Sequence, residues 1–342
     1  MPLVSFCIPT YGRARYLRGT IGSALAQSLP DIEVVVVDDV SPDETAEVVR
    51  RIRDPRVRYV RNDQNLGVPD NLNRAFSLAR GEFAVLLEDH DLLSPDYAER
   101  TIRLLRKHPG MVFVATGQVQ IDEDGAPLAC YLENIDEVTS GRAFLRKLLT
   151  RVTCPFSVTT TVRRSCLKKL VHPFDPQYGW YADQNLWMQL CTIGDVGYLR
   201  APLLQMRVRE ADHFLSGKPE WEILLLVDRI HRENWRLLHP STSARDLLDR
   251  ATYDVCKTAR LAMTWAARLG QGKPWAKDDW AYASKYVSPV GRALFRVATL
   301  CPTTLIPSLR RLYRWQFRLR RSPSRLAQTG QQWQLPRSLR TR

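Results

Sequence analysis

Three acidic side chains and a histidine follow one apolar run in this chain of 342 residues. The run Phe83–Leu87 leads directly into Glu88-Asp89-His90-Asp91. Hard divalent cations prefer oxygen ligands, and Mg²⁺ is usually held by one or two carboxylates together with phosphates and water. A histidine ligand would favour Mn²⁺, because imidazole is softer than carboxylate. The cluster predicts a metal and phosphate site, and the alternative interpretation is a solvated turn that caps the next helix.

Polar residues also follow the other apolar runs of the N-terminal part. They form the segments Pro9-Thr10-Tyr11-Gly12, Asp38-Asp39-Val40-Ser41 and Arg61-Asn62-Asp63-Gln64-Asn65-Leu66-Gly67. An open α/β sheet binds ligands at the carboxyl ends of its strands, so these segments are expected at one edge. The chain lacks the glycine patterns of a dinucleotide-binding site after the first run and of a P-loop. A metal ion is therefore the expected partner of phosphate.

Short apolar runs alternate with helical patterns over the first 130 residues. Residues 32–37 are apolar without polar alternation apart from Glu33, which is typical of a parallel strand covered on both faces. Alternation of this kind predicts an α/β fold with a mostly parallel sheet and helices on both faces. Ser41-Pro42 predicts a helix start. The expected strands are 3–8, 32–37, 57–60, 83–87 and 112–115, and the expected helices include 13–28, 71–79 and 95–107.

The pattern changes further along the chain. Residues 153–162 are rich in Thr, Ser and Val and predict strand and loop, and residues 182–191 predict a helix. Beyond residue 215 the pattern predicts amphipathic helices at 221–238, 244–269 and 280–286. We expect a catalytic and nucleotide-binding domain at 1–215, a helical extension at 216–290, a basic amphipathic segment at 291–321 and a disordered tail at 322–342.

The motifs of residues 3–215 resemble, in order and spacing, the family 2 nucleotide-sugar glycosyltransferases of GT-A fold. The matching runs are Val4–Tyr11, Ile32–Ser41, Asn65-Leu66-Gly67 and Ala79–Phe83 with the acidic cluster after it. The resemblance implies an inverting transfer of sugar from a UDP- or dTDP-linked donor. The acceptor would be a hydroxyl of a glycan or lipid-linked molecule in polysaccharide biosynthesis at the cell envelope.

The same resemblance implies roles for individual residues. Asp39 would accept a hydrogen bond from the base, and an acceptor facing an imide N–H suits uracil or thymine. The family's Asp-x-Asp-Asp is replaced by Glu88-Asp89-His90-Asp91, so the metal ligand, for Mg²⁺ or Mn²⁺, is Asp89, His90 or Asp91. The other residues implied to bind the nucleotide sugar are Pro9, Thr10, Tyr11, Asn65, Gly67, Asn73, Glu88, Asp89 and Arg207.

Asp183 is the expected catalytic residue. The run Tyr181–Leu190 resembles the family's Glu-Asp pair followed by Leu-Trp, with Ala182 in place of the Glu. An acceptor hydroxyl must lose its proton as it attacks the anomeric carbon, and a carboxylate can take that proton. Without the resemblance, Asp183 would be interpreted as an acidic residue favoured at a helix N-terminus.

Net charge is concentrated at the C-terminus. The chain carries +14, yet residues 291–342 hold twelve Arg and no acidic residue, which leaves about +2 for the rest. A uniformly basic nucleic-acid binder is thereby disfavoured. Arginines alternating with apolar residues over 291–321 are typical of a helix at a membrane interface. Contact with an anionic membrane is expected there; the alternatives are packing on the catalytic domain and, last, nucleic acid.

The seven cysteines are scattered without a C-x-x-C pair, which favours reduced thiols over a disulfide framework or a zinc site. The chain has no secretory signal and no long apolar span. We therefore expect a cytoplasmic protein, peripheral at the inner face of the cell membrane. Two other functions remain open: a non-catalytic nucleotide-sugar-binding protein of the same fold, favoured by Ala182 and the altered acidic motif, and a nucleotidyltransferase.

Overall fold

The computed structural model describes residues 1–150, 157–208, 220–240, 243–270, 289 and 292–293. These residues contain a mixed sheet of ten strands with the order β3-β2-β1-β4-β9-β6-β10-β5, and with β7 beside β6 and β8 beside β10. The strands are β1 (Val4–Thr10), β2 (Ile32–Asp38), β3 (Val57–Arg61), β4 (Phe83–Leu86), β5 (Leu92–Leu93), β6 (Met111–Ile121), β7 (Pro127–Tyr131), β8 (Val138–Thr139), β9 (Thr161–Arg163) and β10 (Asp195–Arg207).

Helices connect these strands and follow them. They are α1 (Ala14–Leu25), α2 (Thr45–Arg50), α3 (Val68–Leu78), α4 (Tyr97–Lys107), α5 (Gly141–Thr150), α6 (Arg164–Leu167), the 3₁₀ turn η1 (Pro176–Tyr181), α7 (Ala182–Leu190), α8 (Glu220–Leu238) and α9 (Ala244–Gly270). The predicted order of strands and helices over residues 1–130 is confirmed. Residues 280–286 and 294–342, where a helix, most of the basic segment and the tail were predicted, lie outside the described residues.

Four of the strand pairings in the sheet are parallel. Strands β3, β2, β1 and β4 are parallel neighbours, and β10 is parallel to β6. Between these groups lies β9, which is antiparallel to both β4 and β6. The carboxyl ends of β1, β2, β3 and β4 therefore share one edge, and the polar segments identified in the sequence follow them there.

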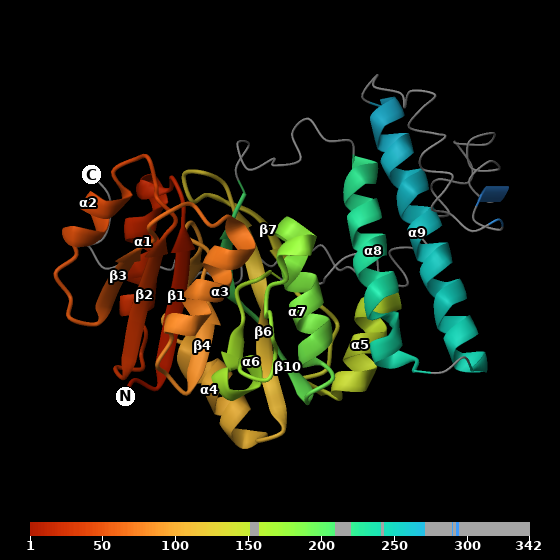
Figure 1. Ribbon diagram of the computed structural model, residues 1–342, viewed down its shortest axis with the longest axis horizontal. Coiled ribbons are helices and arrows are strands. Elements are labelled where there is room, and N and C mark those ends of the chain that lie inside the picture. The colour runs from red at the N-terminus through yellow and green to blue at the C-terminus, as the bar shows by residue number, and fades with distance from the viewer. Residues whose placement is uncertain (151–156, 209–219, 241–242, 271–288, 290–291, 294–342) are drawn as a thin grey trace. The chain divides into compact units, whose positions relative to one another are not determined.

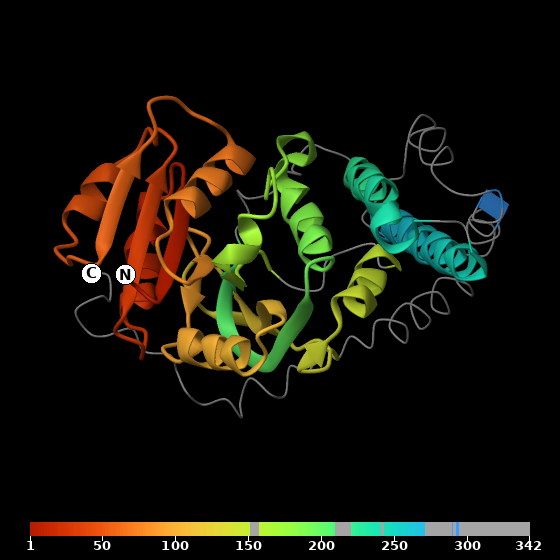
Figure 2. The ribbon, with the colours of Figure 1, turned by 60° about the horizontal axis from the view of Figure 1, so that its bottom comes forward.

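The sheet is covered on both faces (Figures 1 and 2). One face packs on α1 and α4, and its core includes Phe6, Leu17, Val36, Val85 and Ile102, all at most 2% exposed. Helices α3 and α7 lie on the other face, where the Trp187 ring packs on Phe113. The α/β fold with helices on both faces is thus confirmed.

The described residues divide into two compact units. The first holds residues 1–141 and 157–208, with the whole sheet. The second holds residues 142–150 of α5 together with α8 and α9, so that it includes a segment assigned from the sequence to the first domain. In the second unit Asp228 is buried and bonded to Tyr253 and to the ammonium group of Lys257, at 3.1 and 2.8 Å.

One predicted helix start is wrong. Helix α2 begins at Thr45, not at Ser41, and its N-cap residue is Glu44, whose side chain makes no capping bond. The Asp43 carboxylate, just before it, accepts the Thr45 N–H at 3.2 Å. The same carboxylate accepts the Ala14 N–H at the start of α1, at 3.0 Å. Ser41 instead accepts the Gly12 N–H through its hydroxyl, so that the loops after β1 and β2 are joined.

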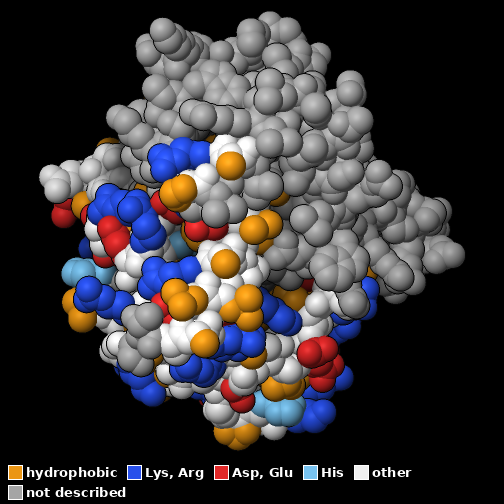
Figure 3. Space-filling model, turned by 90° about the vertical axis from the view of Figure 1, so that its right-hand side faces the viewer, with side chains coloured by type: hydrophobic (Ala, Val, Ile, Leu, Met, Phe, Trp, Pro, Cys, Tyr) orange, Lys and Arg blue, Asp and Glu red, His pale blue; other side chains and the backbone are white. Residues whose placement is uncertain are grey.

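No helix among the described residues is both long and apolar enough to cross a membrane. On the face shown in Figure 3, the Lys and Arg side chains of the described residues are interspersed with acidic and apolar ones.

Candidate active site

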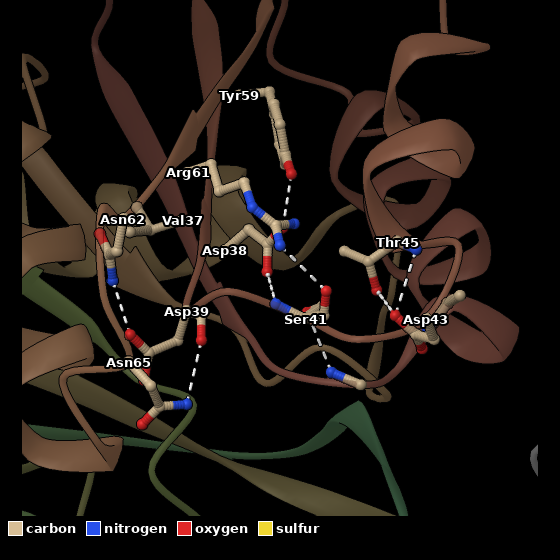
Figure 4. A network of polar contacts seen from close by, with 12 residues as sticks. Val37, Asp38, Asp39, Ser41, Asp43, Thr45, Tyr59, Arg61, Asn62 and Asn65 are labelled. Atoms are coloured by element: carbon tan, nitrogen blue, oxygen red, sulfur yellow. Dashed lines mark hydrogen bonds and ion pairs between the residues drawn. The ribbon is translucent and has the colours of Figure 1, made fainter.

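Two adjacent carboxylates, one at the last position of β2 and one directly after it, make different contacts (Figure 4). Asp38 is fully buried and accepts hydrogen bonds from the Ser41 N–H at 2.8 Å, from Arg61 at 2.7 Å and from the Tyr59 hydroxyl. These contacts join β2 to β3 and fix the start of the loop. Asp38 therefore holds the backbone in place, and Asp39 is left to face the neighbouring loop.

Asp39 organises the segment after β3. Its Oδ1 accepts the Asn62 amide at 2.7 Å and the Leu66 N–H at 2.8 Å, and its Oδ2 accepts the Gly67 N–H at 2.9 Å. Asn65 donates to the main-chain oxygen of Asp39 at 3.0 Å. A carboxylate offers about four acceptor positions, so Asp39 keeps capacity for one more donor.

The backbone between these groups is strained. Val40 has φ 65°, and it is the only non-glycine residue with a positive φ among the described residues. A β-branched residue in this region is a genuine outlier. The flanking bonds hold it there, because the Asp39 N–H donates to the Thr10 oxygen at 2.9 Å and the Ser41 N–H is bound by Asp38. Strain of this kind is concentrated at functional sites.

The segment after β1 lies beside this loop. Thr10 is 2% exposed, and its hydroxyl oxygen is buried without a hydrogen-bond partner. Pro9 is half-buried, and the Tyr11 side chain is 52% exposed. An exposed ring next to the Asp39 loop is available to stack on a planar ligand.

The acidic loop after β4 brings three possible ligands together. Oxygen or nitrogen atoms of Glu88, His90 and Asp91 all lie within 4.8 Å of one another. Asp91 is fully buried, and its Oδ2 has no hydrogen-bond partner. Asp89 is outside this group, and its carboxylate lies 3.0 Å from Nδ1 of His90. A buried, unpartnered carboxylate oxygen beside two further ligand atoms fits a divalent cation.

Raised pKa values favour the protonated forms of two side chains in this loop. Burial opposes a charged His90, yet the hydrogen bond to Asp89 and the charges of Asp91 and Glu88 raise its pKa. Burial and the repulsion from Glu88 raise the pKa of Asp91, although the charge of His90 acts in the opposite direction. A bound cation would displace these protons, since ligand groups must be deprotonated.

Asp183, the expected catalytic residue, lies in the first turn of α7. Its side chain is half-buried. Burial raises its pKa to about 7, the Glu88 charge adds to the effect, and hydrogen bonds to the Gln184 main chain and the Trp187 side chain oppose it. The charge of Glu88 is one cause of this shift, so the acidic loop contributes to the electrostatic surroundings of Asp183.

Two of the sequence-predicted site residues bind main-chain atoms of the protein itself. The Asn73 amide exchanges two hydrogen bonds with the main chain of Phe174, at 2.7 and 2.9 Å, and so ties α3 to the segment before η1. Arg207 donates through Nε to the His90 oxygen at 3.1 Å and through Nη1 to the Asp122 and Glu123 oxygens at 2.8 Å each. Burial lowers the pKa of this guanidinium.

Sequence reasoning missed the residues that support Asp38 and Asp39. Asn62 donates to Asp39 and also to Asn71 at 3.0 Å, and Asn71 in turn donates to the Val37 oxygen at 3.2 Å. Tyr59 and Arg61 support Asp38 in the same way. The position of residues 59–62, at the carboxyl end of a strand beside β2, is the sequence feature that could have indicated this supporting role.

Comparison with known proteins assigns the first unit to a family. The family model described as glycosyl transferase family 2 matches residues 5–171. An uncharacterized glycosyltransferase of Rickettsia typhi is 30% identical over 211 residues, 61% of this chain and 65% of its own length. The chondroitin synthase of Pasteurella multocida is 34% identical over 131 residues, and the succinoglycan biosynthesis protein ExoO of Rhizobium meliloti is 40% identical over 102.

The matched segment is 38% of this chain for the synthase and 30% for ExoO. The chain spans 14% and 29% of the lengths of these two relatives.

Two solved structures share the fold. Residues 1–349 of S. aureus TarS in complex with UDP-GlcNAc give a TM-score of 0.53 at 18% identity, covering 83% of this chain and 91% of that one. The mannosyltransferase PcManGT from Pyrobaculum calidifontis, in complex with GDP-Man and Mn²⁺, gives 0.51 at 18% identity, covering 92% and 88%. The motifs, the sheet and the family match agree: residues 5–171 of this chain form a glycosyl transferase family 2 domain.

Proposed function

We propose that the protein transfers a sugar from a nucleotide diphosphate donor, UDP- or dTDP-linked, to a hydroxyl of a glycan or lipid-linked acceptor, with inversion. One observation carries the proposal: the Asp183 carboxyl and the acidic loop lie close enough for Glu88 to raise the pKa of Asp183. A proton acceptor and a phosphate-neutralising loop are the two groups that such a transfer needs. Polysaccharide biosynthesis is the proposed setting, because ExoO and the chondroitin synthase are relatives.

The nucleoside would bind over the loops after β1, β2 and β3. Asp39 has one acceptor position left, which suits the imide N–H of uracil or thymine, and the Tyr11 ring is exposed beside it. The strained turn at Val40 and the bonds to Leu66 and Gly67 hold the acceptor oxygen in place before the ligand arrives. Pre-organisation of this kind lowers the entropic cost of binding.

The diphosphate would bind at the acidic loop. Glu88, His90 and Asp91 would hold the cation, and Asp89 would orient His90 through the bond to Nδ1. When bound, Mg²⁺ or Mn²⁺ would neutralise charge that develops on the leaving diphosphate. Mn²⁺ suits this donor set because it includes an imidazole, and a structural neighbour of the same fold was solved with Mn²⁺.

Asp183 would take the proton from the acceptor hydroxyl as that oxygen attacks the anomeric carbon. With a pKa of about 7, raised by burial, the carboxylate is basic enough to accept a proton near neutral pH. No second carboxylate is proposed as a nucleophile, so a single displacement inverts the anomeric centre.

A donor panel tests the proposal. The full chain is incubated with UDP-, dTDP- and GDP-sugars, with Mn²⁺ or with a chelator, and the released nucleoside diphosphate is measured. We expect release from a UDP- or dTDP-sugar that depends on metal and falls in Asp183→Asn. Binding without release from any donor would favour a non-catalytic protein, and release of pyrophosphate from a nucleoside triphosphate with a sugar phosphate would favour a nucleotidyltransferase.

The basic segment at residues 291–321 is proposed to attach the protein to an anionic membrane, where a lipid-linked acceptor would be at hand. Its support is its composition, with arginines among apolar residues.

A further inference from the structure

Arg207 lies at the end of β10, between the acidic loop and a hairpin turn. Strand β10 pairs with β5 through Gln205 and Leu92, so its end lies beside the loop that precedes β5. On its other side Arg207 is paired with Ile121 of β6, after which the turn to β7 follows. The sheet register therefore puts Arg207 within reach of both segments.

Arg207 makes contacts with a segment on each side of it. Its N–H donates to Oδ1 of Asp91 at 2.9 Å, and its Nε donates to the His90 oxygen at 3.1 Å. Its Nη1 donates to the oxygens of Asp122 and Glu123 at 2.8 Å each. Three of the five guanidinium N–H groups are thus used to hold two loops together, and the main chain of the same residue orients a proposed metal ligand.

The aromatic ring of Tyr16, on α1, supports this arrangement. The guanidinium carbon lies 4.9 Å from the ring centroid, in the range of a cation–π contact. The Tyr16 hydroxyl donates to the Glu123 carboxylate at 3.3 Å, on the same hairpin turn. The ring and the carbonyl oxygens together fix the plane of the guanidinium. Its N–H groups therefore point at the acidic loop on one side and at the hairpin turn on the other.

We propose that Arg207 is a positioning residue that holds His90 and Asp91 in the geometry that binds the divalent cation. This proposal rests on the proposed function, because it needs the metal site at the acidic loop. It differs from the role implied by the family resemblance, in which Arg207 touches the diphosphate. A planar fork that joins three carbonyls cannot be replaced by an ammonium group, which is a point charge on a flexible stem.

Metal binding without nucleotide separates the two roles. Mn²⁺ alone is titrated into the full chain and followed by the electron paramagnetic resonance signal of free Mn²⁺. Loss of a group that orients a metal ligand typically costs 10- to 100-fold in metal affinity. We expect the Mn²⁺ dissociation constant to rise about tenfold or more in both Arg207→Met and Arg207→Lys. The matched control is Arg200→Met, an exposed arginine of the same strand, which should bind Mn²⁺ like the wild type.

The donor kinetics add a second readout. At saturating Mn²⁺ we expect Arg207→Lys to regain most of the wild-type kcat, while its Mn²⁺ requirement stays shifted. Thermal unfolding of each variant shows whether it is folded. If Arg207→Met is unfolded, the Mn²⁺ affinities of Arg207→Lys and Tyr16→Leu test the positioning role instead. Tyr16→Leu should also weaken Mn²⁺ binding.

Unchanged Mn²⁺ affinity in the folded Arg207 variants, with a raised KM for the donor that Lys restores, would overturn the positioning role and favour direct contact with the diphosphate. If the wild type itself fails to bind Mn²⁺, both the proposed metal site and the positioning role of Arg207 are contradicted.

Discussion

At the scale of single residues, the site depends on side chains whose surroundings change their ordinary chemistry. Asp38 and Asp39 are neighbours in sequence, yet one binds Arg61 and Tyr59 while the other binds Asn62 and two main-chain N–H groups. The sequence predicted Asp39 as the base acceptor. It could not identify Asn62 as its support, because that contact depends on the pairing of β2 with β3.

The pH dependence of turnover tests the role of Asp183. Burial raises its pKa to about 7 in the fold, and only the deprotonated form can accept a proton. We therefore expect kcat/KM to fall about tenfold per pH unit below pH 7 and to level off above it. Asp183→Asn should lose at least about 100-fold in kcat, while the exposed Asp136→Asn should not change it. A flat profile between pH 5 and 8 would argue against Asp183 as the base.

The strain at Val40 gives a second prediction. Its φ of 65° costs a β-branched residue about 1–2 kcal/mol, whereas Asn adopts this conformation readily. Val40→Asn should therefore raise the free energy of unfolding by about 1 kcal/mol, as measured by denaturant titration. Val40→Thr, which keeps the β-branch, is the matched control and should give no such gain. A destabilised Val40→Asn would show that the turn is not strained.

At the scale of elements, the alternation of strands and helices could be predicted because each buried strand is a nearly continuous apolar run, as in residues 32–37. Strand β9 has only three residues, Thr161–Arg163, and its position between β4 and β6 depends on pairing with residues far away in the sequence. The start of α2 was misplaced for a related reason. Asp43 binds the first residue of α2 and also the start of α1, a contact that no local pattern contains.

The helical unit makes its own prediction. Burial lowers the pKa of His231 to about 4, and its Nδ1 lies 3.1 Å from the Leu149 oxygen. The unfolded state, with a pKa near 6.5, therefore binds more protons between pH 6.5 and 4. Stability from a neutral His231 is fully present above pH 6.5 and is lost as pH falls toward 4, by about 3 kcal/mol.

Denaturant titrations at pH 7 and pH 4 measure this loss. His231→Gln should remove that part of the acid sensitivity, and the exposed His172→Gln should keep it. Equal acid sensitivity in wild type and His231→Gln would contradict the prediction.

At the scale of the whole molecule, most of the net positive charge lies far along the sequence from the residues of the proposed active site. The proposed site is an acidic edge of the sheet, and twelve arginines lie after residue 290. Binding to vesicles of anionic and neutral lipid tests the role assigned to residues 291–321. We expect the full chain to sediment with anionic vesicles only, more weakly at high salt, and a chain ending at residue 290 to stay in the supernatant. Equal binding by both chains would place the attachment elsewhere.

The central claim is that one site holds both the cation and the base, and diffraction from crystals with Mn²⁺ and UDP tests it most directly. We predict an anomalous peak within coordination distance of Glu88, His90 and Asp91, with the diphosphate on its open side and the Asp183 carboxylate across the sugar position from the diphosphate. A peak away from these three residues, or UDP bound away from the Asp39 loop, would contradict the account.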